Sequence, residues 1–318
     1  MDHINYKRWV DLFQKKAKNL KDLEILREID IGYNSKVYLI SIDEKKYAVK
    51  MFDERFNGTA VCQTESNNIQ KARKVIPDAV PRVLFCSNYV ENKFRREIMV
   101  MENAKGIPIN EKNLDEKVYE NLISVLKRLH STRTGKINIS NEKKRIDECR
   151  NTIIEFLKNE DIIAKKRVIK HLDTLREYYF EKTIFNFQKT IIHGDLWWDN
   201  ILVDSGKIRI IDWLESSEQD YCRDLAQLQI GVLNELFDSE KSQYFFKKIL
   251  NTYKREFNDE KIFERIRYYL SVMYLEEAFY LPFKFFNWEI KYRENGETFK
   301  NRVIEYFQKS EFYFTNNI

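Results

Sequence analysis

The sequence has no apolar run that approaches the roughly 18 residues of a membrane-spanning helix. Its first residues, Met1-Asp-His-Ile-Asn-Tyr-Lys-Arg-Trp9, lack the apolar core of a secretory signal. Internal repeats and low-complexity segments are also absent. These absences argue against a membrane protein, and we expect a soluble protein of the cytoplasm with no membrane partner.

Cysteine is sparse, and no two cysteines form a CxxC pair. The four are Cys62, Cys86, Cys149 and Cys222. In a cytoplasmic chain, scattered cysteines without metal-site spacing predict reduced thiols, most of them buried. No histidine has a second histidine or a cysteine at metal-ligand spacing, so we interpret His130 as a packing residue at a helix end.

A large excess of one charge is also missing, because the formal net charge is only +5 over 318 residues. Lysine and glutamate alternate along most segments, which favours solvated helix faces over a nucleic-acid groove. We therefore expect no nucleic-acid partner. With 43% hydrophobic residues, the chain is long enough for two lobes with separate cores.

The N-terminal third combines one leading helix, over residues 4–20, with strand-forming segments. Apolar and β-branched residues predict strands at 25–31, 36–42, 46–52, 83–87 and 95–101, the first three as an antiparallel meander. The turn from Gly32 to Ser35 is small and polar, so its N–H groups could approach phosphate oxygens. An ordinary hairpin turn is the alternative.

Lys50 lies out of step with its apolar neighbours Tyr47, Val49 and Met51. A lysine on the inner face of a strand needs a partner, because an unpaired buried ammonium group is costly. Glu65, on a helix expected from Thr59, could pair with it and aim the ammonium group at nucleotide phosphates. An exposed lysine beside an unrelated glutamate is the other interpretation.

A polar crossing follows the fifth strand, Glu102-Asn-Ala-Lys-Gly-Ile-Pro108. Its glycine and proline and its lack of periodicity predict a lobe boundary, with an N-terminal lobe of residues 1–103 and a C-terminal lobe of residues 104–318. A hinge there would leave the backbone groups near Met101 and Asn103 free to hydrogen-bond a flat base.

The C-terminal lobe is expected to be mostly helical. Helices are predicted at 111–130, twice within 141–186, and at 221–236, 242–256, 262–283 and 297–309. Glu277 continues an apolar face of the 262–283 helix. Its carboxylate could face a cleft, or it could pair with a nearby arginine.

The most informative stretch is Ile191-Ile-His-Gly-Asp-Leu-Trp-Trp-Asp-Asn200, followed by a short hairpin. Strands at 201–203 and 208–211 flank the tight turn at 204–206. This hairpin places Asp195, Asn200 and Asp212 at one end of a small sheet. Their oxygen atoms are the hard donors that hold Mg²⁺ beside phosphate.

Taken together, these motifs resemble the aminoglycoside phosphotransferase and choline kinase-like family. The resemblance spans residues 24–285 and rests on residues in a fixed order: Gly32, Ala48-Val-Lys50, Glu65, Met99-Val-Met-Glu102, Leu129-His130, His193-Gly-Asp195, Asn200, Ile211-Asp-Trp213 and Arg223-Asp-Leu-Ala226. It implies an α+β, two-lobed protein-kinase-like fold. The N-terminal lobe would hold a five-stranded antiparallel sheet with a helix, and the C-terminal lobe would be larger and mostly α-helical.

The resemblance also implies an enzyme that transfers a phosphoryl group from ATP or GTP to an alcohol group. Asp195 would orient the acceptor hydroxyl and accept its proton, and Asn200 and Asp212 would coordinate Mg²⁺. Lys50, held by Glu65, would contact the α- and β-phosphates. Gly32, Ser35, Met101 and Asn103 complete the nucleotide-binding set, and His193 and Asp224 would brace the catalytic loop.

The sequence departs from protein kinases in ways that favour a small-molecule acceptor. It has His193-Gly-Asp195 instead of His-Arg-Asp, and it lacks the Asp-Phe-Gly and Ala-Pro-Glu motifs. Only eleven residues lie between Asp212 and Asp224, too few for a peptide-docking segment.

Acidic and aromatic residues near the loop suggest an amine-bearing acceptor such as an aminoglycoside, choline, or a related amino-alcohol or sugar. The candidate substrate residues are Trp197, Trp198, Trp213, Glu215 and Glu277. Core packing and a solvated loop are the alternatives for these residues. A non-catalytic nucleotide-binding protein, similar to the kinase-like spore-coat proteins, is the competing functional hypothesis.

Overall fold

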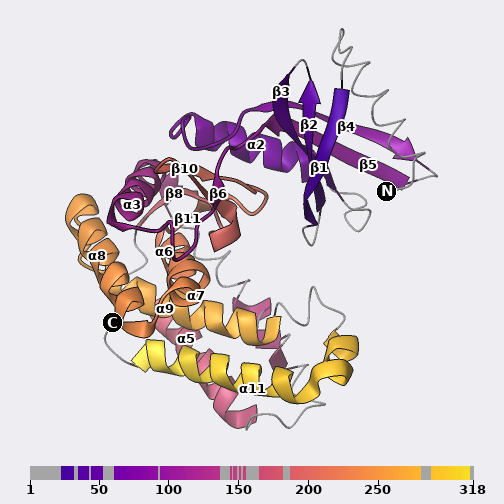
Figure 1. Cartoon of the computed structure of the whole chain (residues 1–318). Helices are drawn as coiled ribbons and strands as arrows, with labels where there is room; N and C mark the ends of the chain where they lie inside the picture. Colours follow the sequence, from indigo (N-terminus) through magenta and orange to yellow (C-terminus); the bar gives the residue numbers. More distant parts are fainter. Residues whose placement is uncertain are drawn as a thin grey trace. The chain divides into compact units, whose positions relative to one another are not determined.

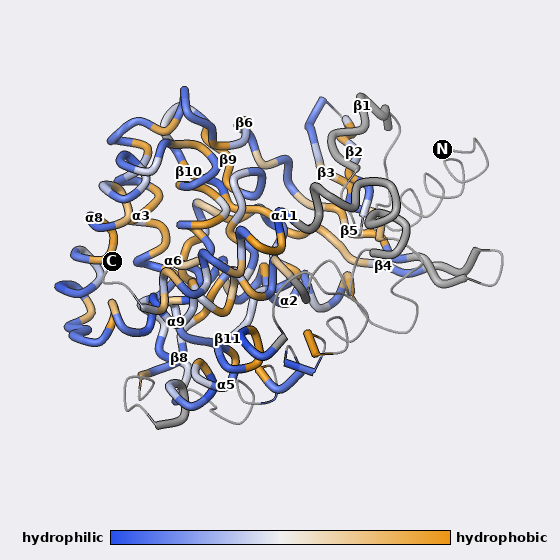
Figure 2. The backbone as a smooth tube through the Cα atoms, turned by 90° about the horizontal axis from the view of Figure 1, so that it is seen from below, coloured by the Kyte–Doolittle hydropathy of each residue, from blue (hydrophilic) through white to orange (hydrophobic). Residues whose placement is uncertain are grey.

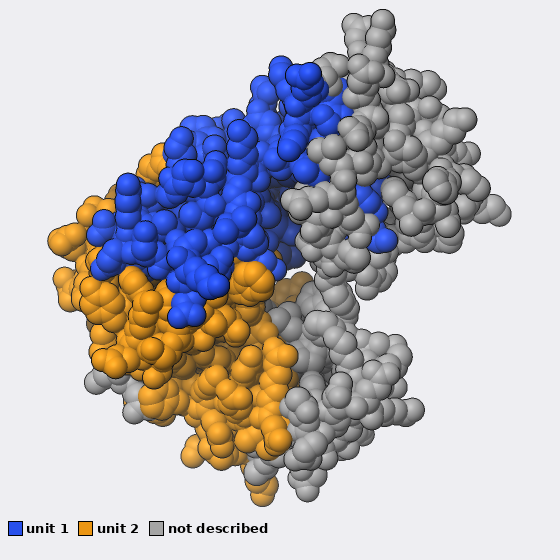
Figure 3. Space-filling view, in the orientation of Figure 1, with its two compact units in different colours: residues 1–125, 199–216 blue, residues 126–198, 217–318 orange. Residues whose placement is uncertain are grey.

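The computed structural model describes residues 23–31, 35–42, 44–52, 61–91, 94–136, 165–181, 187–280 and 288–315, and most of 144–154. The chain divides into two compact units, residues 1–125 with 199–216 and residues 126–198 with 217–318 (Figure 3). Each unit combines helices with antiparallel strands (Figure 1). No helix among the described residues is long and apolar enough to span a membrane.

The first unit is built on a five-stranded antiparallel sheet in the order β1-β2-β3-β5-β4 (Figure 1). Its strands are β1 (Leu23–Ile31), β2 (Ser35–Ile42), β3 (Lys45–Phe52), β4 (Val83–Glu91) and β5 (Phe94–Glu102). All five predicted strands are therefore present, and their bounds differ from the predictions by a few residues.

One face of this sheet carries the hydrophobic core of the lobe. The core consists of Tyr38, Ile40, Ile42, Val49, Ile98 and Val100. Because side chains alternate along a strand, Lys50 points to the opposite face from Val49. Helix α2 (Val61–Arg73) packs against β4 and β5 and buries Glu65 and Ile69.

The first unit also contains a smaller sheet in the order β10-β9-β6. Strands β9 (Ile201–Asp204) and β10 (Lys207–Ile210) form the predicted hairpin, and β6 (Ile107–Pro108) pairs with β9. Ser205 and Gly206, with φ angles of 51° and 80°, form a two-residue turn with both residues in the left-handed region. Figure 2 shows hydrophobic residues along β9 and β10.

The second unit holds a three-stranded sheet and most of the helices. The sheet order is β11-β8-β7, with β7 (Gly135–Lys136), β8 (Gln188–Ile192) and β11 (Ser217–Gln219). Its helices include α5 (Lys165–Glu181), α6 (Cys222–Leu228), α7 (Asn234–Leu236), α8 (Ser239–Phe257), α9 (Ile262–Leu275) and α11 (Trp288–Thr315). Helix α3 (Glu116–His130) crosses the division between the units.

Local sequence signals explain where several helices begin and end. Asp115 accepts a hydrogen bond from Val118 N at the start of α3, at 2.8 Å. Asp238 caps α8 by accepting from Lys241 N, and Asn258 ends that helix in the left-handed conformation. Both caps satisfy backbone groups that a helix leaves unpaired at its ends.

Two predicted helices contain a wider turn that the hydrophobic pattern did not reveal. A π-helical segment, η4 (Gln229–Leu233), interrupts the 221–236 helix, and another, η5 (Glu276–Tyr280), follows α9. Hydrophobic periodicity indicates which residues face the core, but it does not show which carbonyl oxygen each N–H group bonds, so a single π-turn within a helix is not apparent from it. The predicted 297–309 helix is also longer, because α11 spans 28 residues.

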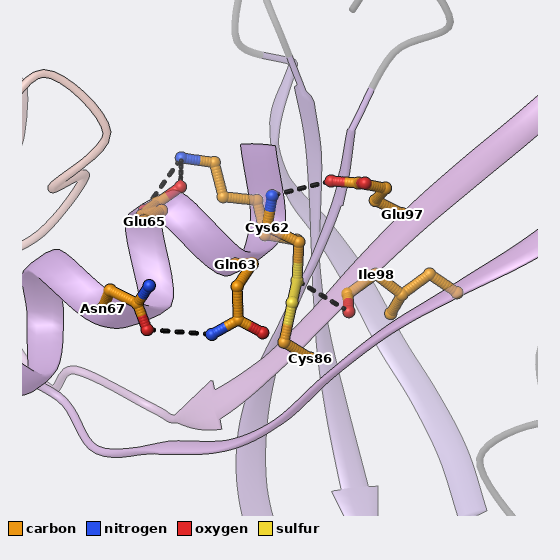
Figure 4. Close-up of a disulfide and its surroundings, with 8 residues drawn as sticks. Cys62, Gln63, Glu65, Asn67, Cys86, Glu97 and Ile98 are labelled. Carbon is orange, nitrogen blue, oxygen red and sulfur yellow. Dashed lines mark hydrogen bonds and ion pairs between the residues drawn. A yellow bond between two sulfur atoms is a disulfide. The ribbon is translucent and has the colours of Figure 1, made fainter. Parts of the chain in front are cut away.

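The expectation of reduced cysteines is wrong for two of the four. Cys62, in the first turn of α2, and Cys86, in β4, form a disulfide (Figure 4). Their Cα atoms lie 6.0 Å apart, inside the usual disulfide range. Packing of α2 on β4 creates this proximity across 24 residues, which cysteine spacing does not show. Cys222 is a buried free thiol, as expected.

Several predictions fall outside the described residues. They are the 4–20 helix, Gly32 and its turn, and the state of Cys149. The lobe boundary at residue 103 also stays a prediction.

Candidate functional site

The predicted partnership of Lys50 and Glu65 is confirmed. The ammonium nitrogen of Lys50 lies 2.9 Å from Glu65 Oε2 and 3.2 Å from Oε1. It also donates to Asp212 Oδ1 at 2.7 Å. Strand β3, helix α2 and the segment after β10 thus bring one cation and two carboxylates together. We call Lys50, Glu65 and Asp212 the phosphate-side cluster.

Burial sets the electrostatics of the phosphate-side cluster. The side chains of Lys50 and Glu65 are 6% and 1% exposed, whereas that of Asp212 is 40% exposed. Burial alone would lower the pKa of Lys50, but the two carboxylates outweigh it and raise that pKa. Lys50 therefore stays charged. Burial raises the pKa of Glu65, and the ammonium group opposes that rise.

The backbone at Asp212 has an uncommon conformation. Its φ angle is 60°, in the left-handed region that costs free energy for a residue with a side chain. The preceding residue, Ile211, donates its N–H to Asn200 O at 3.0 Å. This bond holds the backbone of Asn200 beside that of Asp212, so both predicted metal ligands lie at one end of the hairpin.

Sequence reasoning missed Asn68, which supports the segment after Asp212. Its side-chain amide donates to Trp213 O at 2.9 Å and to Leu214 O at 3.3 Å. Asn68 lies three residues after Glu65 on α2, so both side chains share one helix face. The three-residue spacing from Glu65 could therefore have indicated that Asn68 lies near the site.

The other predicted nucleotide-binding residues of the first unit lie in or beside its large sheet. Met101 is paired in register with Ala48 and is 8% exposed. Asn103 follows the end of β5 and is half-buried. Ser35 begins β2 opposite Phe52 and is buried.

Asp195, the predicted catalytic residue, lies in the second unit on the loop after β8. The loop is folded tightly, because Asp195 N donates to His193 Nδ1 at 3.2 Å and Trp197 N donates to Asp195 O at 3.0 Å. The side-chain amide of Gln227 reaches Asp195 Oδ1 at 3.5 Å, a long contact. Gln227 was not predicted, although it lies one helical turn after Asp224.

The predicted bracing of this loop by Asp224 is confirmed. Asp224 accepts from His193 N at 2.8 Å and from Gly194 N at 2.9 Å. Its Oδ2 also lies 3.0 Å from Nε2 of His130, whose Nδ1 is 2.8 Å from the Tyr253 hydroxyl group. His130, His193 and Asp224 are each 0% exposed. His130 is thus a buried packing residue, as predicted.

The tryptophans of the central segment differ sharply in exposure. Trp213 is fully buried and its indole N–H donates to Ile210 O at 2.9 Å. We correct its assignment as a substrate residue, because a fully buried indole presents no surface to an acceptor. Trp198 is 41% exposed.

Trp197 packs closely on the π-helical segment η4. A Cβ atom at Gly231 would lie 2.7 Å from Trp197 Cε3, closer than side chains tolerate. The tryptophan can therefore occupy this position only because residue 231 is glycine. This contact supports the packing role for Trp197.

The acidic segment 215–220 is only partly available to a cation. Glu215 is exposed, but Asp220 is 1% exposed and lies 2.7 Å from the Arg265 guanidinium group. Asp220 is therefore part of the interior. Arg265, 45 residues further along the chain, neutralises the Asp220 carboxylate. Asp220 is therefore not available to attract a cationic acceptor.

Glu277 lies in η5 and is mostly buried. Burial, together with the carboxylates of Glu276 and Glu235, raises its pKa to about 7, and Arg302 opposes the rise. The sequence had left open a cleft-facing acid and an arginine partner. The guanidinium group of Arg302 acts on the carboxylate, but it does not cancel the effect of burial.

No group of three or more His, Cys, Asp or Glu side chains poised for a metal ion exists in the part of the chain that the structure describes. A nucleotide-bound magnesium ion needs fewer protein ligands, because phosphate and water supply the remainder. An aspartate and an asparagine at one hairpin end fit that requirement. The Oδ2 atom of Asp212 has no hydrogen-bond partner among the described residues.

Three solved structures with the same fold are distant from this chain in sequence. APH(4)-Ia matches with a TM-score of 0.63 and 14% identity, covering 96% of this chain and 99% of that one. The complex of APH(2″)-IIa with gentamicin gives 0.62 and 17%, covering 99% and 98%. The amicoumacin kinase hAmiN, in complex with AMP-PNP, Ca²⁺ and Ami, gives 0.66 and 14%, covering 97% and 96%.

The fold is thus the two-lobed protein-kinase-like fold, with mixed helix and antiparallel sheet, and the expected fold class is confirmed. The chain belongs to the phosphotransferase enzyme family, which its sequence matches over residues 25–259. A search of curated proteins found no match.

Proposed function

We propose that the chain transfers the γ-phosphoryl group of ATP or GTP to a hydroxyl group of a small, amine-bearing acceptor. The observation that carries this proposal is the phosphate-side cluster, where Lys50 lies 2.9 Å from Glu65 and 2.7 Å from Asp212. A buried pair alone could be structural. The cluster instead has one half-exposed carboxylate with an uncommon backbone conformation, which suits a ligand-binding group.

In this proposal, Lys50 contacts the α- and β-phosphates of the nucleotide, and Glu65 keeps its ammonium group in place. Met101 and Asn103 flank the base through backbone groups. A nucleoside triphosphate co-substrate is consistent with a reaction in the cytoplasm. Support for the nucleotide comes from the similar hAmiN, which was solved with AMP-PNP.

Asn200 and Asp212 would hold Mg²⁺, which supplies charge neutralisation between the nucleotide phosphates when bound. Both offer hard oxygen donors. Asp212 already uses Oδ1 for Lys50, so Oδ2 is the oxygen that remains for a metal.

Asp195 would accept the proton of the acceptor hydroxyl group. The hydroxyl oxygen forms a bond to the γ-phosphorus, and the bond from that phosphorus to the β–γ bridging oxygen breaks. The nucleoside diphosphate leaves with those electrons. Phosphoryl transfer depends mainly on positioning, and Asp224 provides it by fixing the backbone of the loop that carries Asp195.

The amine-bearing nature of the acceptor is supported by charge and by similar proteins. Glu277, Glu276 and Glu235 place negative charge in the second unit, and Glu215 is exposed in the first. Similar structures include a gentamicin complex and one with hygromycin B. Trp198 remains a candidate acceptor contact, because its indole is partly exposed.

A coupled assay of nucleoside diphosphate release tests the proposal, over aminoglycosides, choline, ethanolamine, amino acids and sugars with ATP and then GTP. With an accepted substrate, Asp195→Asn is expected to lower kcat by about 10²- to 10⁴-fold. Asp199→Asn makes the same change four residues further along the same loop and is the matched control.

Turnover of the Asp195→Asn variant at the control rate would contradict the assignment of Asp195. Magnesium-dependent nucleotide binding without turnover across the whole panel would instead favour a non-catalytic nucleotide-binding protein.

A further inference from the structure

A cavity lies in the first unit, away from the phosphate-side cluster. Its volume is about 940 Å³, at the upper end of the range for small-molecule sites. Tyr47 lines it, whereas Lys50, Glu65 and Asp212 do not. Because side chains alternate along β3, Tyr47 lies on the opposite sheet face from Lys50. We call this space the basic cavity.

Cations converge on the basic cavity from segments far apart in the sequence. Lys45 and Lys46 come from the start of β3, Lys105 from the crossing after β5, and Lys207 from the start of β10. In the described part of the chain, none of these four lysines has an ion-pair partner. Four uncompensated ammonium groups around one cavity repel one another, and an anion would relieve that repulsion.

Two arginines of the basic cavity are held in place without losing their charge. Arg73 donates to the carbonyl oxygens of Pro77 and Val80, and Arg209 donates to that of Asp78. A guanidinium group has five N–H donors in a rigid fork, so each arginine keeps donors for a ligand. A carbonyl oxygen orients the fork and does not neutralise it.

Acidic groups do not balance these cations. Glu44, Glu102 and Asp204 are the carboxylates that line the cavity, against seven cationic side chains. The carboxylate of Glu102 is already paired with Arg82, since its Oε1 lies 3.1 Å from Arg82 Nε. The cavity thus keeps a clear positive excess although the net charge of the whole chain is small.

We propose that the basic cavity binds a small anion with at least two phosphate groups, distinct from the nucleotide of the proposed reaction. The fixed forks of Arg73 and Arg209 suit phosphate oxygens, and the four lysines supply mobile charge around them. Tyr47 and Pro81 add ring surfaces on which an organic part of the ligand can rest.

Calorimetric titration of the full chain with inorganic triphosphate, in chelator and without magnesium, tests the proposal. Lys45→Ala/Lys207→Ala is expected to weaken binding at least about tenfold, because it removes two of the four lysine charges that line the cavity. Arg209→Gln, which keeps a donor for Asp78 O, should weaken binding by a similar factor. Lys112→Ala/Lys117→Ala removes the same charge from exposed positions of the same unit and should bind like the wild type.

The Lys50→Ala variant separates this site from the proposed reaction. Triphosphate binding that survives in Lys50→Ala supports the basic cavity, and it does so whether or not the chain is a kinase. Loss in Lys50→Ala with none in the two cavity variants would overturn the proposal. Equal weakening in the Lys112→Ala/Lys117→Ala control would also overturn it, as would tighter, cavity-dependent binding of a single-stranded oligonucleotide.

Discussion

Each compact unit buries a cation between two carboxylates, and the two arrangements differ in exposure. In the first unit Lys50 lies between Glu65 and Asp212, and the Asp212 side chain is 40% exposed. In the second unit Arg265 lies between Asp220 and Asp259, and the three side chains are 1%, 0% and 3% exposed. Similar ion clusters therefore differ in solvent exposure: the cluster of the first unit is open to solvent at Asp212, and the cluster of the second unit, which we call the closed cluster, is fully buried.

In the closed cluster, both carboxylates contact other groups of the protein. Asp220 Oδ1 accepts from Cys222 N at 3.0 Å, and its Oδ2 lies 2.7 Å from Arg265. Both oxygens of Asp259 contact Arg265, and Tyr221 donates to one of them. Asp212, in contrast, keeps one oxygen without a partner among the described residues. The carboxylates of the closed cluster thus face groups of the protein only, whereas Asp212 keeps an oxygen that can also bind a ligand.

Arg265→Met tests the closed cluster and should have the largest effect on stability. The change leaves two buried carboxylates without their cation, which costs about 3–5 kcal/mol of unfolding free energy. Urea unfolding measures the loss. Arg255→Met, at a side chain that is 77% exposed, is the control and should change stability by less than about 0.5 kcal/mol. Equal losses of unfolding free energy in Arg265→Met and Arg255→Met would show that the closed cluster does not contribute to stability.

Gly231→Ala tests whether packing in the second unit positions the catalytic loop. The added methyl group would meet Trp197, whose N–H donates to Asp195 O, so the loop must shift. Overpacking of this kind costs about 1–3 kcal/mol. We expect a lower kcat in the diphosphate-release assay with an unchanged KM for the nucleotide, because the proposed nucleotide site lies in the first unit.

The same alanine placed at Gly206 is the control, since a Cβ there meets nothing within 4 Å. Gly206 has a φ of 80°, so its substitution strains the hairpin turn without touching the loop. A normal kcat in Gly231→Ala would refute the positioning of Asp195 through Trp197.

Glu277→Gln should produce the smallest effect, a change in how stability depends on pH. The folded-state pKa of Glu277, about 7, lies above its ordinary value of 4.5, so the folded protein retains a proton that the unfolded chain releases. Wild-type stability relative to the variant should therefore fall as the pH rises from about 4.5 to about 7, and then level off. Urea unfolding at several pH values measures this difference, and a difference that does not vary with pH would be inconsistent with a buried carboxyl group.

Much of the first unit could be predicted from short-range pattern. Strand alternation indicated the meander, and the out-of-step Lys50 led to Glu65. The polar turn between two β-branched runs indicated the hairpin that carries Asp212. These features depend on residues near one another along the chain, where periodicity is informative.

Long-range packing could not be predicted in the same way. The local sequence places Asp220 in an acidic segment that could be solvated, whereas its ion pair with Arg265 lies in the interior. Cys62 meets Cys86 only because α2 packs on β4. Trp197 packs against Gly231, which lies on a π-helical segment further along the chain. Each depends on a partner that the local sequence does not identify.

The central claim is that the half-exposed carboxylate of the phosphate-side cluster binds a magnesium–nucleotide complex. Calorimetric titration of ATP and GTP, each with and without Mg²⁺, tests it in the wild type, in Asp212→Asn and in the exposed-carboxylate control Glu111→Gln. We expect Mg²⁺ to strengthen nucleotide binding in the wild type and in Glu111→Gln, and we expect Asp212→Asn to abolish this strengthening. Magnesium-dependent binding of equal strength in Asp212→Asn would contradict it.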